Sequence, residues 1–186
     1  MDNLNKDCLV YILNNFLHDK DKINFISTCI KYYDYINYIY FDSIVHINRI
    51  KNLKHLDRFT NIIISRKRNK LPSNLLHLTF NYDFDQDIKG CIPDGITHLT
   101  FGKVFNRDIK DAIPNGVTHL TFGTRFNQCI KEALPNNIKH LTFGYCFNQC
   151  IKEAIPNGVT HLTFGLLFNQ CIKEAIPNSV THLNLK

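Results

Sequence analysis

Six histidines recur in this sequence at intervals of 21 residues, and the imidazole column they form is the first feature that could carry chemistry. They are His77, His98, His119, His140, His161 and His182. Imidazole is a common ligand of zinc and copper, and it titrates close to neutral pH. A zinc site needs three or four ligands that converge from several directions, whereas one column places its ligands along a line. We therefore expect neither a metal site nor a cofactor.

A second column consists of cysteines. Cys129, Cys150 and Cys171 follow the same interval, and Asp87 and Asp108 occupy the equivalent positions in earlier units. Because the position accepts aspartate, we expect these thiols to be partly exposed. They are expected to be reduced, in the cytoplasm or nucleus, since the seven cysteines are an odd number and the start lacks the layout of a secretion signal. Their spacing of about 5 Å is also compatible with disulfide geometry.

Catalysis has no candidate residues in this sequence. No glycine-rich phosphate loop, pair of catalytic carboxylates or nucleophile elbow accompanies the two columns. We therefore expect a protein that is not an enzyme.

Both columns belong to a 21-residue repeat that positions their side chains. Prolines and phenylalanines recur at the same interval without insertions. In one unit, residues 119–122 alternate polar and apolar side chains, as is typical of a half-buried strand. Val117, Leu120 and Phe122 have the apolar spacing of leucine-rich repeats. Since one unit is too short to bury its own apolar face, stacked units must share one core. The sequence therefore predicts a solenoid with His119 and Thr121 on its exposed, concave side.

The second half of each unit is expected to return along the convex side as a short helix. Phe126, Ile130 and Ala133 recur at helical spacing, and Pro135 would end such a helix. Stacked asparagines are expected to satisfy backbone groups of the turns; they are Asn106, Asn127, Asn148 and Asn169. The predicted fold class is an α/β repeat solenoid, a leucine-rich-repeat-like stack of 21-residue strand-plus-short-helix units with a small α-helical N-terminal module.

The unit resembles the FNIP repeat, a variant related to leucine-rich repeats. Residues 126–130, with the sequence FNQCI, and residues 155–165, with the sequence IPNGVTHLTFG, carry the resemblance. The first unit departs from it, because Asn81 replaces the glycine and Asp85 the asparagine. Such a departure is expected of an atypical end repeat.

The first forty residues are predicted to form three short helices. One apolar face combines Leu9, Ile12, Leu13, Phe16 and Leu17, a second helix carries Ile23, Ile26 and Ile30, and a third carries Tyr35, Ile36 and Ile39. This layout resembles an F-box, the helical module that docks onto the adaptor subunit of a cullin-type ubiquitin ligase. It departs from the F-box where Asn5 replaces the usual proline and where the third helix lacks a tryptophan.

The resemblance to the F-box implies an adaptor-binding surface. Its residues would be Leu4, Leu9, Ile12, Leu13, Phe16, Leu17, Ile23 and Ile26. Three helices in so few residues are too small to be stable alone. The alternative is therefore that these helices only cap the first coil of the solenoid.

The net charge of +6 belongs to a connecting segment and not to the repeats. We divide the chain into the helical module at 1–41, a basic connector with degenerate first coils at 42–70, and the solenoid at 71–186. Within the connector, residues 44–47 and 62–64 look like strands that extend the sheet. The basic cluster at 66–70 is interpreted as a solvated loop, with a nuclear import signal as the alternative. A phosphate backbone would need cations along the repeats, so no nucleic-acid partner is expected, and the absence of a long apolar run predicts no membrane span.

The predicted function is a protein–protein interaction scaffold, with the target on the concave face and the ligase adaptor on the N-terminal module. The target-binding residues would be His98, Thr100, His119, Thr121, His140, Thr142, His161 and Thr163. Six strands about 4.8 Å apart give a face of a few hundred Å², below the roughly 800 Å² per partner of a standard interface. The target must therefore also touch the loops around Gly102, Gly123, Gly144 and Gly165, be a short peptide, or bind weakly. The alternative is a stand-alone binding module.

The histidine column also predicts an electrostatic effect. Imidazolium groups about 5 Å apart repel one another, so each histidine pKa should lie below about 6.5.

Overall fold

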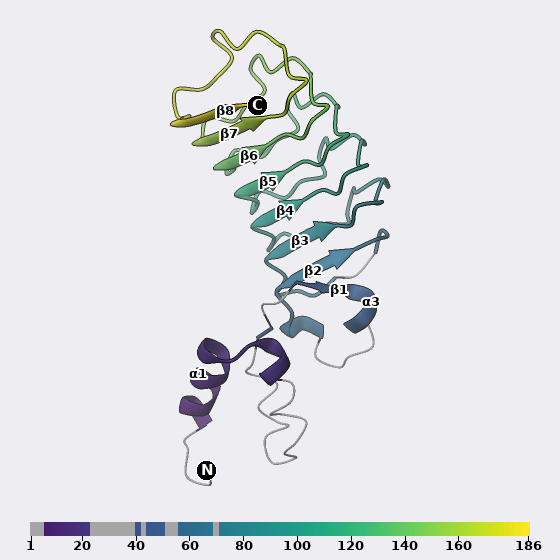
Figure 1. The fold of residues 1–186 in the computed structure, drawn as a ribbon, viewed down its shortest axis with the longest axis vertical. Coiled ribbons are helices and arrows are strands. Elements are labelled where there is room, and N and C mark those ends of the chain that lie inside the picture. The colour runs from purple at the N-terminus through teal and green to yellow at the C-terminus, as the bar shows by residue number, and fades with distance from the viewer. Residues whose placement is uncertain (1–5, 23–39, 42–43, 51–55, 69–70) are drawn as a thin grey trace.

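The structure is a computed structural model that describes residues 6–22, 40–41, 44–50, 56–68 and 71–186. It shows an elongated stack of coils with a helical segment at its N-terminal end (Figure 1). The helical elements are α1 (Lys6–Phe16), α3 (Ile47–Ile50) and η2 (Leu56–Arg58). The strands are β1 (Val45–His46), β2 (Asn61–Ile64), β3 (His77–Phe80), β4 (His98–Thr100), β5 (His119–Thr121), β6 (His140–Thr142), β7 (His161–Phe164) and β8 (His182–Leu185).

These strands form one parallel sheet in chain order, from β1 to β8. From β3 onward each residue pairs with the residue 21 positions later, as in His119 with His140 and Thr121 with Thr142. The predicted solenoid of parallel strands is therefore confirmed. The strands predicted in the connector are also present, because β1 pairs with β2 and β2 pairs with β3. The degenerate first coils thus continue the sheet of the repeats.

The core is a stack of phenylalanine and aliphatic columns behind the strands. Leu120 and Phe122 are buried while His119 and Thr121 are only half-buried, which is the predicted alternation. The ring of Phe122 lies 3.9 Å from that of Phe126 in its own coil and 5.5 Å from that of Phe143 in the next, measured between centroids. Aromatic pairs at such distances stabilise a core beyond simple area burial. Each coil therefore completes the core of its neighbour.

The predicted short helices are wrong. All residues from 71 to 186 are described, and none of them is helical. The returning segment of one coil makes a single turn, in which the amide of Ala133 donates to the carbonyl of Ile130 at 3.1 Å. Glu132 within that turn has a φ of 57°, in the left-handed region that a right-handed helix cannot contain.

Hydrogen bonding between coils also replaces the helical pattern. The amide of Asn127 donates to Oδ1 of Asn106 in the preceding coil at 2.9 Å, rather than to a carbonyl of its own segment. Phe126 and Ile130 are nevertheless fully buried. Their helix-like spacing therefore reflects two side chains that enter the same core from an extended segment.

The N-terminal helix packs against the first coils. Leu13 is 1% exposed and belongs to the same buried cluster as Phe41 and Phe59, and Leu17 packs against that cluster. Buried Lys22 donates from Nζ to the carbonyl of Tyr40 at 2.9 Å and pairs with Asp19 at 3.2 Å. The buried cluster therefore joins α1 to the solenoid, and Lys22 joins residues 19–22 to Tyr40.

The remaining predicted helices are mostly outside the described residues. Residues 19–22 are helical, and residues 23–39 lie outside the described part. Among the described residues, the helices are too short to cross a membrane.

Candidate functional site

The predicted target-binding residues come together on the strand surface that faces away from the core, which we call the His/Thr face. It contains the column His77, His98, His119, His140, His161 and His182, and the column Thr79, Thr100, Thr121, Thr142, Thr163 and Asn184. From β3 to β7 these side chains are half-buried, and on β8 they are exposed. Because register is uniform, the face presents the same two groups on every coil from β3 to β7.

The imidazole rings form one continuous stack along this face. Centroids of adjacent rings lie 4.1 to 4.2 Å apart, and the angles between their planes range from 4° to 21°. Rings at this separation are in van der Waals contact. The column is therefore a continuous surface of stacked rings with nitrogen atoms at their edges.

A threonine before the strand orients most of these imidazoles. Oγ1 of Thr118 lies 2.9 Å from Nδ1 of His119 and donates to the carbonyl of Thr97 at 3.2 Å. A hydroxyl has one hydrogen and a carbonyl only accepts, so both contacts are made together only when Nδ1 of His119 carries a proton. Nε2 of the neutral ring is then an acceptor available to a partner. The same arrangement occurs at Thr97, Thr160 and Thr181.

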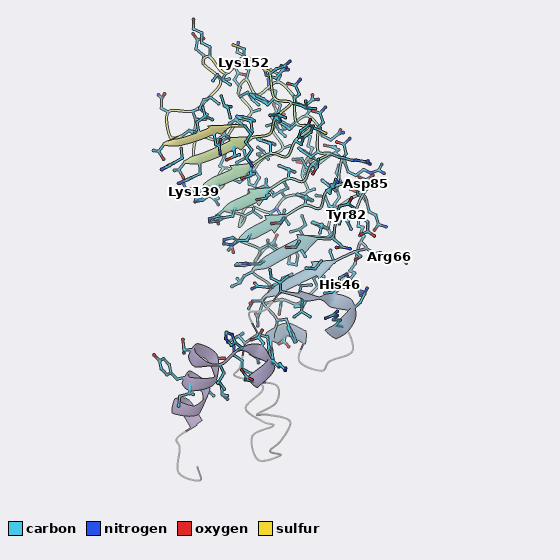
Figure 2. All side chains as sticks on the ribbon, in the orientation of Figure 1. His46, Arg66, Tyr82, Asp85, Lys139 and Lys152 are labelled. Atoms are coloured by element: carbon cyan, nitrogen blue, oxygen red, sulfur yellow. The ribbon has the colours of Figure 1, made fainter. Side chains whose placement is uncertain are left out.

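One coil departs from this pattern. Lys139 takes the position of the threonine before His140, and it is exposed. Figure 2 places Lys139 at the end of the sheet where the strands begin, far from Asp85 across the coil. Within the described part of the chain, Lys139 makes no ion pair. This coil therefore adds an unpaired cation beside the histidine column.

The electrostatics of the column favour neutral rings. Burial lowers the pKa of His98, His119, His140 and His161, and neighbouring histidines lower each pKa further. The predicted direction of the pKa is confirmed at these four histidines, and burial, which was not considered, contributes more than the predicted repulsion. At neutral pH these four histidines are therefore an uncharged row of hydrogen-bonding groups.

The cysteine column lies apart from this face and is exposed, as predicted. Cys129, Cys150 and Cys171 are free, exposed thiols. In the described ranges, no group of three or more His, Cys, Asp or Glu side chains is placed to hold a metal ion.

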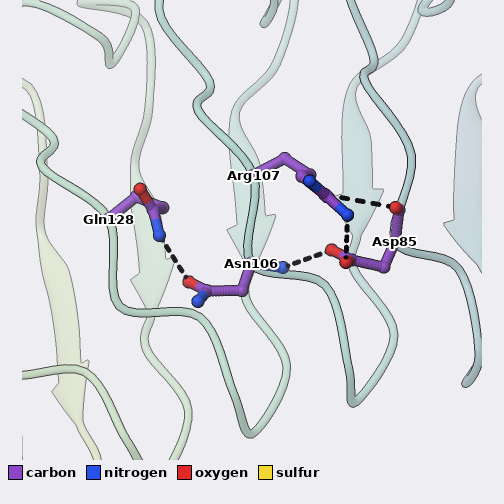
Figure 3. Close-up of polar contacts among 4 residues, drawn as sticks. All are labelled: Asp85, Asn106, Arg107 and Gln128. Atoms are coloured by element: carbon purple, nitrogen blue, oxygen red, sulfur yellow. Dashed lines mark hydrogen bonds and ion pairs between the residues drawn. The ribbon is translucent and has the colours of Figure 1, made fainter.

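Amide side chains fix the turns on the side opposite the strands (Figure 3). Oδ1 of Asp85 accepts from the amide of Asn106 at 3.0 Å, and Oδ1 of Asn106 accepts from Nε2 of Gln128 at 2.9 Å. Arg107 pairs with the other oxygen of Asp85 at 2.8 Å. The predicted role of the asparagines in satisfying turn backbone is therefore confirmed, and Asp85 fills it in the first unit.

The basic cluster contributes to the same network. Arg66 and Lys67 are exposed. Nζ of Lys67 lies 3.2 Å from Asp87, and this contact, after the amide of Lys89, holds the pKa of the Asp87 carboxyl below its usual value. Lys67 thus ties the segment to the first repeat as an exposed loop. A role of the basic cluster in nuclear import stays a prediction.

The proposed adaptor-binding residues are divided by the structure. Leu13 and Leu17 face the core, whereas Ile12 is 39% exposed and its neighbour Tyr11 61% exposed. Leu4, Ile23 and Ile26 lie outside the described residues, as do the side chains of Leu9 and Phe16. The helical periodicity therefore identified the apolar face of α1, and the burial of Leu13 agrees with the alternative that this face covers the first coil.

A cleft between α1 and the first coils was not anticipated from the sequence. It has a volume of about 600 Å³, and its walls include Asn14, Tyr40, Asn74 and Leu76. The cleft exists because α1 crosses the start of the solenoid, a packing arrangement that no local pattern specifies. Its walls are mostly uncharged amides, hydroxyls and aliphatic groups.

A parallel stack with a 21-residue period and a polar strand face defines a leucine-rich-repeat-like solenoid. The model of the FNIP Repeat family matches residues 65–104, 84–125, 105–146, 126–166 and 147–186. These matches together cover more than half of the chain. The protein therefore belongs to the FNIP repeat family.

Named relatives occur in Acanthamoeba polyphaga mimivirus. The chain is 29% identical to "Putative F-box protein L166" over 49% of this chain and 37% of that protein. It is 35% identical to "Putative F-box and FNIP repeat-containing protein R286" over 39% of this chain and 30% of that protein. The chain thus spans about a third of the length of these relatives.

A solved structure supports the architecture. The crystal structure of CroV588, described as a novel circular LRR protein, aligns with a TM-score of 0.54 and 38% identity. The alignment covers 69% of this chain and 24% of that chain.

Proposed function

We propose that this protein is a protein–protein interaction scaffold that holds its target on the His/Thr face. The observation that carries the proposal is the uninterrupted imidazole stack, in which the preceding threonines make the Nε2 atoms of four rings a row of acceptors; these rings are those of His98, His119, His161 and His182. Backbone amides and donor side chains of a polypeptide are suited to such a row. The residues that would contact the target are His98, Thr100, His119, Thr121, His140, Thr142, His161 and Thr163.

We further propose that the N-terminal module docks the protein onto the adaptor of a cullin-type ubiquitin ligase. Two kinds of observation support this. The mimivirus relatives L166 and R286 carry F-box in their names. In addition, Tyr11 and Ile12 form an exposed apolar pair on α1. Ubiquitin transfer would belong to other subunits, and this chain would select the substrate.

The second candidate is a stand-alone binding module whose N-terminal helix only caps the solenoid. Burial of Leu13 in the solenoid core favours it, because a cap must cover the first coil with apolar side chains. The two candidates differ in whether Tyr11 and Ile12 bind another protein.

Co-purification of the full chain with a ligase adaptor separates them. Ile12→Asp should abolish the association and leave the thermal unfolding of the solenoid unchanged, since Ile12 is outside the core. Leu185→Asp is the matched control, because it makes the same change at an exposed residue of β8, at the other end of the molecule. If folded wild-type protein recovers no adaptor, the cap is the correct interpretation.

Substitution of the imidazoles tests the target site. Replacing His119, His140 and His161 together with Glu should abolish binding of targets recovered with the wild-type chain. The control replaces Cys129, Cys150 and Cys171 with Asp, which adds equal charge to the same three coils at a column where Asp108 already occurs. Binding that survives the histidine changes would place the target elsewhere.

A further inference from the structure

The His/Thr face repeats from coil to coil, so it cannot by itself distinguish one target sequence from another. Residues 114–134, 135–155 and 156–176 form three complete coils that share most positions. At only two positions do all three coils differ, and these two positions directly follow the glycine that ends each strand. The pairs are Thr124–Arg125, Tyr145–Cys146 and Leu166–Leu167, and the earlier coils have Tyr82–Asp83 and Lys103–Val104. We call these five pairs the turn row.

The backbone of the turn row is held rigidly from coil to coil. The amide of Arg125 donates to the carbonyl of Lys103 at 2.9 Å, and the amide of Cys146 donates to the carbonyl of Thr124 at 2.8 Å. The same bond joins Val104 to Tyr82 and Leu167 to Tyr145. Because these bonds use only backbone atoms, the side chains can differ without disturbing the stack.

From Gly102 to Gly165, packing requires glycine just before each pair but leaves the two residues of the pair free to vary. A Cβ at Gly123 would meet the carbonyl of Gly102, and a Cβ at Gly144 would meet that of Gly123. The sequence is therefore constant where neighbouring coils touch. It varies at the next two positions, where side chains reach the surface.

The exposed side chains of the turn row change in character along the molecule. Lys103 and Arg125 are exposed, and Nζ of Lys103 lies 5.3 Å from the ring centroid of Tyr82. Towards β8 the row becomes apolar, with Tyr145 47% and Leu166 60% exposed. From the coil of Lys103 to that of Leu166 the row therefore changes from basic to apolar.

The two cations of the turn row differ from three cations of the loops opposite the strands. Arg107, Lys110 and Lys131 each pair with a carboxylate of a neighbouring coil. Lys103 and Arg125 have no ion pair within the described ranges. Asp83, the one carboxylate of the row, accepts from Nδ2 of Asn81 at 3.0 Å. Lys103 and Arg125, like Lys139 beside the histidine column, are therefore charges that a bound partner could neutralise.

We propose that the turn row selects the target, and that it fits an extended peptide segment with carboxylates over Lys103 and Arg125 and apolar side chains over Tyr145, Leu166 and Leu167. This inference rests on the proposed function, because the row borders the His/Thr face and would read side chains of a segment held there. From the coil of Lys103 to that of Leu166 the row spans three strand spacings, about 14 Å, which is about five extended residues.

Two synthetic peptides of the same composition test the proposal with the full chain. In one peptide two glutamates precede two leucines, and in the other the order is reversed. Fluorescence anisotropy should show that the wild-type chain prefers one order by about fivefold, since exposed ion pairs and partial apolar burial each contribute modestly. The peptide direction need not be known in advance.

The decisive variant reverses the order of the pairs without changing composition. It exchanges Lys103–Val104 with Leu166–Leu167 and Thr124–Arg125 with Tyr145–Cys146, and it should invert the peptide preference. The variant in which Asp replaces Cys129, Cys150 and Cys171 is the control and should keep the wild-type preference. If the exchanged variant does not unfold cooperatively, Arg125→Glu replaces it and should favour a peptide with lysines in place of the glutamates.

The outcomes separate this inference from the proposed function. If Glu at His119, His140 and His161 abolishes binding while the exchanged variant keeps the wild-type preference, the inference is overturned and the His/Thr face remains the target site. If both variants bind as the wild type does, both proposals fail. A wild-type chain that does not prefer either order, or binds neither peptide, also overturns the inference.

Discussion

The imidazole rings of His119 and His140 lie face to face, with centroids 4.2 Å apart and planes at 10° to each other. Two charged rings at this distance would repel, and each is also partly withdrawn from water. Both effects lower the pKa of these histidines below the ordinary value of 6.5. The folded chain therefore binds protons less readily than the unfolded chain does.

Stability should consequently fall as the solution is acidified. Well above pH 6.5, a histidine whose pKa is lower in the folded state does not affect the free energy of unfolding. As the pH falls below 6.5, the unfolded chain takes up the proton more readily than the folded chain, so the free energy of unfolding decreases. His98, His119, His140 and His161 all act in this direction. Urea unfolding should show a lower midpoint at pH 5.5 than at pH 7.5.

Glutamine provides the control for this pH dependence. A chain with Gln at these four positions lacks the groups that titrate, so its urea midpoint should change much less between the two pH values. The carboxyl of Asp87, whose pKa is lowered, titrates in a more acidic range and does not affect this comparison. Equal midpoints for the wild type at both pH values would contradict the role assigned to the histidine stack.

Gly144→Ala should destabilise the solenoid by about 1 to 3 kcal/mol, the range for overpacking a filled site. The added Cβ would meet the backbone carbonyl of Gly123, which cannot move without separating two coils. Gly95→Ala is the matched control, because its nearest atom, the carbonyl oxygen of Leu75, lies at an ordinary 3.6 Å. Gly95→Ala should be neutral or stabilising by up to about 1 kcal/mol, since alanine reduces the entropy of the unfolded chain. Chemical denaturation of both variants measures the difference.

The residues of the strand face were predictable from two periods in the sequence. Side chains alternate between the two faces of each strand, and the strands recur every 21 residues. Once Leu120 and Phe122 enter the core, His119 and Thr121 must face outward, and the exact repeat sets the register. The returning segment was not predictable in the same way. Phe126 and Ile130 have a spacing that suits either a helix or an extended segment, and the competing bond from Asn127 to Asn106 connects residues 21 positions apart.

The partner of Leu13 was left open by the sequence, and the variable positions of the turn row were overlooked. Amphipathic spacing identifies an apolar face but not its partner, so α1 could bind an adaptor or cap the first coil, and part of its apolar face covers the solenoid. The variation at Thr124 and Arg125 was visible in the sequence. Its meaning depended on the structure, which shows Arg125 exposed and Thr124 half-buried next to a glycine that packing requires.

Asn127→Ala should cost about 1 to 3 kcal/mol, because it leaves buried or half-buried donors without an acceptor. Oδ1 of Asn127 accepts from the amide of Asn148 at 2.9 Å and from Nε2 of Gln149 at 3.0 Å. Asn127→Asp keeps an acceptor at the same place, as Asp85 does in the first repeat, and should change stability far less at pH 7. Similar losses for Ala and Asp in chemical denaturation would show that the amide ladder contributes through packing and not through hydrogen bonds.

Glu132→Gly should stabilise the protein by about 0.5 to 1 kcal/mol, because a left-handed backbone costs about 1 to 2 kcal/mol for a residue with a Cβ and glycine gives back part of that as entropy. Glu132 has a φ of 57°, and Gly90 occupies the equivalent position of the first repeat with a φ of 68°. The substitution removes the pair between Glu132 and Lys110, but at 3.6 Å between exposed groups this contact contributes little. Glu132→Ala removes the same ion pair and keeps the strained backbone, so it isolates the conformational effect. Chemical denaturation should rank glycine above glutamate and glutamate at or above alanine, whereas equal stability of the glycine and alanine variants would show that the left-handed backbone carries no strain here.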